Sequence, residues 1–151
     1  MMPALALLLL SQLLTLNDVK PYGCRVAGEH EHTAWDHILI QRVYPKKLAI
    51  VHGVVLAPGT GTAPMEDVLV ELYDQPEIAL TAKTSSDREK QKRLAACVTG
   101  KDGKFSFDPR PGKYELRLSK HNEWRCTSII IEVSETADRK TRLTVQMEVA
   151  T

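Results

Sequence analysis

Three histidines in the first quarter of the chain have the type and spacing of metal ligands. His30 and His32 are separated by one residue, so on an extended segment both imidazoles point to the same side. His37 or Asp36 would supply a third ligand and Cys24 a fourth. No second cluster completes such a set, and a polar N-terminal arm explains the same residues. The sequence therefore predicts no bound metal and no cofactor, with these histidines as candidate ligands.

A second group of polar and aromatic residues lies in a predicted turn after residue 120. His121, Asn122 and Arg125 surround Trp124 in the sequence. An exposed indole beside such groups is a surface that could bind a sugar or a peptide. The alternative is a tryptophan folded back over the end of the core. We take His121, Asn122, Trp124 and Arg125 as candidate ligand-binding residues.

The residues do not combine into a catalytic set. A nucleophile needs a neighbouring base that a third group orients, and no Gly-x-Ser-x-Gly turn occurs. Asp102 belongs to a turn, where its side chain is expected to cap backbone amides. The Gly59–Thr60–Gly61 stretch lacks the following Lys-Ser/Thr and the helix that a phosphate-binding loop requires. We therefore predict a protein that is not an enzyme.

Alternating apolar residues predict the elements that would position these groups. Tyr114, Leu116 and Leu118 share one face of a strand, and polar residues occupy the other. The same period of two predicts further inward-facing residues at Val68, Val70, Leu72, Ile129, Ile131, Val133, Leu143, Val145, Met147 and Val149. Asp102–Gly103 has the sequence of a tight hairpin, which we expect to pair the strand before it with the one that buries Phe105 and Phe107.

Two segments do not follow this pattern. Residues 75–93 are long and highly charged for a connection between strands. A short solvated helix from about Ser86, capped by the hydroxyl of Ser86 and with Glu89 at its third helical position, is one interpretation, and a mobile surface insertion is the one we favour. Residues 35–45 are expected either to add a strand or to cross the sandwich as an ordered arm.

The N-terminal segment and the cysteines indicate the cellular compartment in which the protein is expected. Residues 3–16 form an uncharged apolar run that is too short to span a bilayer and has the length of a signal-peptide core. A buried N-terminal helix is the alternative. Cys24, Cys97 and Cys126 allow one disulfide in an oxidising compartment, with the pairing open, or three reduced buried thiols.

Composition excludes further classes of function. The 151 residues carry a formal net charge of only +1, so no field of one sign attracts nucleic acid or an anionic membrane. Aromatic residues make up 5%, which is too few for base-stacking platforms. The chain is long enough for one domain with a normal core.

The order of the strands and turns carries a family resemblance. Residues 50–74 (IVHGVVLAPGTGTAPMEDVLVELYD) and 99–120 (TGKDGKFSFDPRPGKYELRLSK), followed by IIIEV and LTVQMEV, resemble the carboxypeptidase regulatory-like domain. The resemblance covers residues 48–150 and implies a prealbumin-like, or carbohydrate-binding-like, fold. It implies no particular activity, because domains of this kind accompany many unrelated proteins.

These observations define a set of expectations. The fold is an all-β, seven-stranded antiparallel Greek-key sandwich that follows a signal-peptide-like segment (1–16) and an arm (17–47) and occupies residues 48–151. The function is that of an exported, non-enzymatic accessory or interaction domain, with a carbohydrate-binding module that uses Trp124 as the alternative. The partner is a protein or glycan at the cell surface. The product is periplasmic or extracellular, either released or retained by its uncleaved N-terminal segment.

Overall fold

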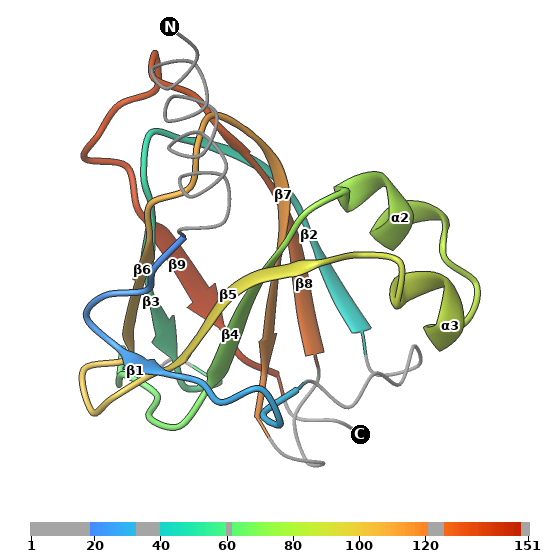
Figure 1. The fold of residues 1–151 in the computed structure, drawn as a ribbon. Helices are drawn as coiled ribbons and strands as arrows, with labels where there is room; N and C mark the ends of the chain where they lie inside the picture. Colours follow the sequence, from blue (N-terminus) through green and yellow to red (C-terminus); the bar gives the residue numbers. More distant parts are fainter. Residues whose placement is uncertain (1–18, 33–39, 60–61, 121–125, 149–151) are drawn as a thin grey trace, which may run out of the picture.

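The computed structural model describes residues 19–32, 40–59, 62–120 and 126–148, and these form two β-sheets with two short helices (Figure 1). In spatial order, the six-stranded sheet contains β1 (Arg25–Val26), β5 (Arg93–Val98), β4 (Leu69–Tyr73), β7 (Gly112–Ser119), β8 (Cys126–Val133) and β2 (Ile40–Leu48). The three-stranded sheet contains β6 (Lys104–Phe107), β3 (Val51–Leu56) and β9 (Leu143–Gln146). The helices are α2 (Pro76–Thr81) and α3 (Ser85–Arg88). The predicted two-sheet β architecture is confirmed.

The hydrophobic core lies between the two sheets. Phe105 and Phe107 of β6 face Leu116 and Leu118 of β7, and all four side chains are almost completely buried. The inward-facing residues predicted from the alternation, from Val68 to Met147, belong to this core, except that Tyr114 is only partly buried and packs against it, and Val149 lies outside the described residues. The period of two therefore identified one buried face of each strand correctly.

The predicted antiparallel arrangement is wrong for two strand pairs. The described residues form nine strands rather than seven, and both β2–β8 and β3–β9 are parallel. Each parallel pair joins a strand from the first part of the chain to one from the last part. Side-chain alternation shows which face of a strand is buried, but it is the same for parallel and antiparallel neighbours. Residues 40–48 supply the extra strand that was one of the two expectations for this region.

Close backbone contacts explain two glycines of the three-stranded sheet. At Gly53 of β3, a Cβ atom would lie 2.5 Å from the carbonyl oxygen of Leu143 on β9. At Gly103 the φ angle is +67°, and a Cβ atom would lie 2.6 Å from the carbonyl oxygen of Val55. Larger residues at either position would push β3 away from its neighbours.

Gly103 also closes the predicted tight turn, since its amide donates to the carbonyl of Gly100 at 3.0 Å. The strands on either side do not pair with each other, however, because β5 joins the six-stranded sheet and β6 pairs with β3. The hairpin prediction is wrong in this respect. The turn residues make the chain reverse, and the apolar faces of the strands determine which sheet each one joins.

No helix within the described part of the chain is both long enough and apolar enough to cross a membrane. The signal-peptide-like segment 1–16 lies outside the described residues.

Candidate functional site

An N-terminal arm, residues 19–32, connects the two sheets along one side of the sandwich. Its strand β1 pairs with β5, where Val26 lies opposite Cys97. Earlier in the arm, Pro21 forms a bridge with Phe107, and the amide of Tyr22 donates to the carbonyl of Ser106 at 3.1 Å. The arm, blue in Figure 1, therefore makes backbone contacts with β5 of one sheet and β6 of the other.

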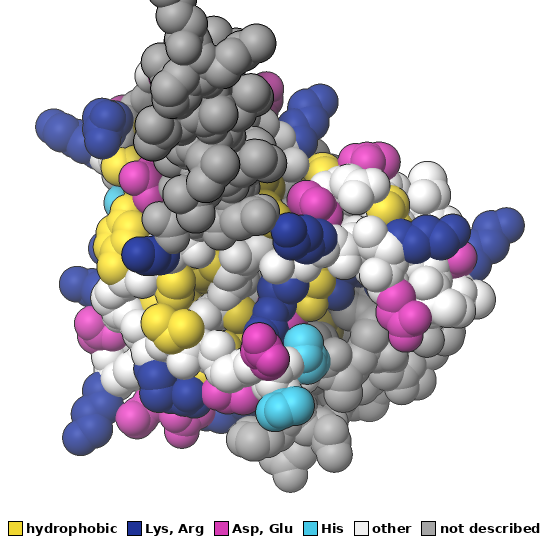
Figure 2. All heavy atoms as spheres, in the orientation of Figure 1, with side chains coloured by type: hydrophobic (Ala, Val, Ile, Leu, Met, Phe, Trp, Pro, Cys, Tyr) yellow, Lys and Arg dark blue, Asp and Glu magenta, His cyan; other side chains and the backbone are white. Residues whose placement is uncertain are grey.

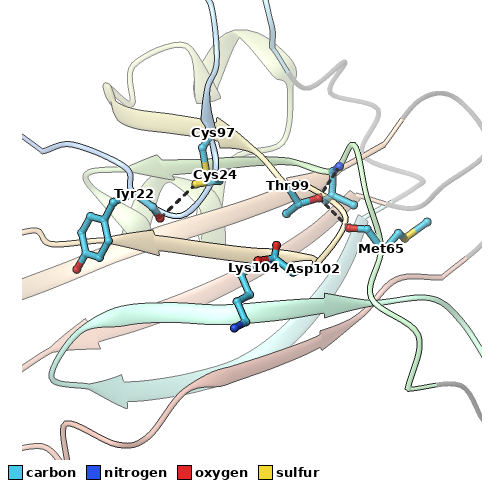
Figure 3. The surroundings of a disulfide bond; sticks show 8 residues. Tyr22, Cys24, Met65, Cys97, Thr99, Asp102 and Lys104 are labelled. Carbon is cyan, nitrogen blue, oxygen red and sulfur yellow. Dashed lines mark hydrogen bonds between the residues drawn. A yellow bond between two sulfur atoms is a disulfide. The ribbon is translucent and has the colours of Figure 1, made fainter.

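A disulfide between Cys24 and Cys97 fixes this arm to β5 (Figure 3). The two Cα atoms are 5.7 Å apart, and the residues are separated by 73 positions in the sequence. Of the three pairings that the sequence left open, the structure therefore contains Cys24–Cys97. Cys126 is a buried free thiol, and burial raises its pKa to about 12. A disulfide is consistent with an oxidising location outside the cytoplasm.

His30 and His32 of the histidine cluster lie at a tight turn of the arm. Glu31 closes this turn. Its carboxylate accepts hydrogen bonds from Nη1 and Nη2 of Arg25, at 2.9 and 3.0 Å, and from the amide of Gly28 at 3.0 Å. The hydrogen bonds from Arg25, with that from Gly28, lower the pKa of Glu31 to about 2. His30 and His32 on either side are exposed. The carboxylate of Glu31 therefore stabilises the turn.

Metal binding requires three or more converging ligands, and the described residues contain no such group of His, Cys, Asp and Glu. His37, the proposed third ligand, lies outside the described residues. His30 and His32 line an open hollow of about 840 Å³ between the arm and β5. Figure 2 shows histidine side chains on one face of the molecule, with basic and acidic side chains around them.

The arm also carries two exposed apolar side chains. Tyr22 is 48% exposed and Val26 is 64% exposed. The third large exposed apolar residue of the described chain, Leu80, is 55% exposed and lies on α2, away from the arm. Val26 and Ala27 line the hollow together with Leu94, Ala95 and the two histidines. The arm therefore presents an apolar surface with a polar border, which is the usual composition of a contact surface.

The outer face of the six-stranded sheet carries a group of buried charged and polar side chains that sequence reasoning missed. Glu115 of β7 is at its centre and is completely buried. One carboxylate oxygen accepts from Arg117 Nε at 2.8 Å and from Gln91 Nε2 at 3.2 Å. The other accepts from Arg88 Nη1 at 3.2 Å and from the hydroxyl of Ser128.

A second buried carboxylate lies beside the first on the neighbouring strand. Glu71 of β4 accepts the hydroxyl of Tyr73 at 2.7 Å and Arg93 Nη1 at 3.2 Å. The guanidinium of Arg117 lies 3.7 Å from the centre of the Tyr73 ring, within range of a cation–π contact. Burial, followed by the charge of Glu71, raises the pKa of the Tyr73 hydroxyl well above its usual value, so this hydroxyl remains a donor.

This network holds the helical insertion and the arm against the sheet. Arg88 ends α3, and its Nη2 also donates to the carbonyl of Ala79 in α2 at 3.0 Å. Arg93 reaches the carbonyls of Gly28 and Glu31 in the arm. Both carboxylates are fully enclosed, so the network is suited to fastening segments together rather than to contacting a ligand from solvent.

The insertion contains two short helices packed against the sheet, so for residues 75–93 the helical interpretation is closer to the structure than the favoured mobile surface insertion. α3 begins two residues before the expected start, with a capping box between Thr84 and Asp87 rather than between Ser86 and Glu89. Arg88 and Gln91 of this highly charged insertion are both buried. Their partners are far away in the sequence, and no local pattern indicates them.

The candidate ligand-binding residues His121, Asn122, Trp124 and Arg125 all lie outside the described residues. The chain matches no known protein-family model and shows no significant similarity to a curated protein. The arm, the hollow beside it and the enclosed polar network are thus the features from which a function must be argued.

Proposed function

We propose that the chain is an exported, non-enzymatic β-sandwich of the carboxypeptidase regulatory-like type, which acts as an accessory domain by binding a partner protein through its N-terminal arm. The observation that carries this proposal is the arm itself: it is fastened by Cys24–Cys97, exposes Tyr22, and exposes Val26 in the lining of a hollow of about 840 Å³. A preorganised apolar surface loses little conformational entropy on binding.

Export is supported by two independent features. The apolar segment 3–16 has the length of a signal-peptide core, and the Cys24–Cys97 disulfide suits an oxidising compartment. Mass spectrometry of the product from the extracytoplasmic fraction should find a chain that contains Cys24 linked to Cys97. A reduced chain confined to the cytoplasm would contradict the export part of the proposal.

The interaction is tested by site-specific photocrosslinking in the native cells. A photoreactive residue replaces Val26 in one chain and Leu80 in a matched control, because the two side chains are similarly exposed on different parts of the molecule. A discrete adduct is expected from position 26 and not from position 80. Excess unlabelled chain should abolish the adduct, whereas excess Val26→Glu chain should not.

Equal crosslinking from both positions, or equal competition by the Val26→Glu chain, would show that the arm is not the interface. No adduct at position 26, combined with glycan-array binding that is lost in Trp124→Ala, would replace this proposal with a carbohydrate-binding function.

A further inference from the structure

The side of the sandwich opposite the arm is bordered by two edge strands, β2 of the six-stranded sheet and β9 of the three-stranded sheet. A cleft of about 430 Å³ lies between them. Buried apolar residues of three strands, Leu48, Ile129 and Leu143, form its floor. Its volume is in the range of small-molecule sites, which is about 300–1,000 Å³.

Cations border this cleft, and the described residues of its lining include no carboxylate. Lys46 and Lys47 of β2 and Arg142, just before β9, all line it and are all exposed. Lys46 lies beside the buried Ile131 in the register of β2 and β8, and Leu48 lies beside Val133. Lys46 therefore shares the inward face of β2 with a core residue, which is an unusual place for a charge.

Lys47 has a different environment, because it lies beside Glu132 in the same register, on the outer face of the sheet. Lys46 and Arg142 are thus the cations most available to a group inside the cleft.

Hydrogen bonds fix the border of the cleft on the β9 side. His52 Nε2 donates to the carbonyl of Thr141 at 3.0 Å. The turn before it is closed by Asp138, whose carbonyl accepts the amide of Thr141 at 3.3 Å and whose carboxylate accepts the amide of Lys140 at 2.9 Å. Arg142 follows this turn directly, so its backbone is held in place without a ligand.

We propose that this cleft binds a small organic anion. The acidic group of the ligand pairs with Lys46 and Arg142, and its apolar body lies against Leu48, Ile129 and Leu143. Charge-assisted hydrogen bonds to an acidic group are among the stronger contacts available in proteins, and the apolar floor adds burial of the ligand body. The site is separate from the arm, so it does not depend on the proposed function.

The test uses 1-naphthalenesulfonate as the anion and 1-naphthylmethanol as its neutral counterpart, with binding measured by equilibrium dialysis on the full chain. The sulfonate should bind more tightly than the alcohol. In the variant Lys46→Gln/Arg142→Gln its affinity should fall by about tenfold or more, because two charge-assisted contacts are lost. Lys46→Arg keeps the charge and should retain binding.

Lys104→Gln/Lys113→Gln is the matched control, since it removes two exposed charges outside the cleft and should leave the affinity unchanged. Equal affinities for the sulfonate and the alcohol would overturn the proposal. It would also be overturned if the double variant bound normally but formed dimers in light scattering, because Lys46 would then protect the edge of β2 against pairing with another strand.

Discussion

The two faces of the six-stranded sheet are both buried, but they are built from opposite kinds of side chain. On β7, Leu116 and Leu118 point into the apolar core, while Glu115 and Arg117 point into the polar network under the helical insertion. The inner face depends on shape and area, which many apolar residues can supply. The outer face depends on particular partners, because a buried charge is tolerated only when its hydrogen bonds are satisfied.

The largest effect is expected from Glu115→Ala on the outer face. This change leaves the guanidinium groups of Arg88 and Arg117 buried without their carboxylate, and removing one partner of a buried ion pair costs about 3–5 kcal/mol. Urea denaturation should show this loss in the free energy of unfolding. The control Glu132→Ala, at an exposed position of β8, should change it by less than about 0.5 kcal/mol. Similar small losses in both variants would mean that the network adds nothing to the fold.

The adjacent change Leu116→Ala should cost slightly less, about 3 kcal/mol, because it removes a fully buried aliphatic side chain and leaves a cavity. The two variants should differ in which region of the molecule loses local stability. Hydrogen exchange of α3 amides should quicken more in Glu115→Ala than in Leu116→Ala at equal global stability. The reverse order would show that the core, not the network, holds the insertion.

A smaller effect is expected at the N-terminus of α3. Thr84 accepts the amide of Asp87 at 3.3 Å, and Thr84→Ala removes this cap at a cost of about 1 kcal/mol. Thermal unfolding monitored by circular dichroism would measure it. Thr81→Ala, in α2 and outside any N-cap, should be neutral or slightly stabilising, since alanine favours helix. Equal losses in the two variants would exclude a capping role.

The smallest expected effect is on stability at acidic pH. The amide of Lys83, and then Thr84, lower the pKa of Asp87 below its ordinary 3.8. Because the folded pKa is the lower one, the stabilisation by this carboxylate is present above pH 3.8 and is lost as the pH falls through the folded value. An NMR titration should find a depressed pKa that rises toward 3.8 in Thr84→Ala. A pKa that does not respond to this substitution would separate Asp87 from the cap.

The alternation predicted the inner face of the sheet well and the outer face only as polar. Val70, Leu72 and Leu116 can be identified as inward-facing from the period of two, because the alternation lies within each strand. The burial of Glu115 depends on Arg88 and Gln91, which lie more than one element away in the sequence. A polar residue that is buried under an insertion and one that is exposed to solvent produce the same alternation of polar and apolar residues. Only the tertiary structure distinguishes the two cases.

The candidate site was predictable to a smaller extent. The spacing of the histidines suggested metal ligands in the arm. In the structure, the carboxylate of the intervening Glu31 instead accepts hydrogen bonds from Arg25 and Gly28. The disulfide could be expected as one of three pairings, since cysteine positions alone carry no distance information. The cleft between β2 and β9 depends on a parallel arrangement that no local feature specifies.

Those parallel pairings have a consequence for how the molecule is made. β2 and β3 find their partners in β8 and β9, so both sheets remain incomplete until the last described strands are available. Contacts between such distant parts of a chain slow folding, often into the range of milliseconds to seconds. During synthesis, β2 would wait for β8, while β3 would have β6 as a neighbour before β9 emerges, and the arrival of β9 would set the time at which the native state first appears.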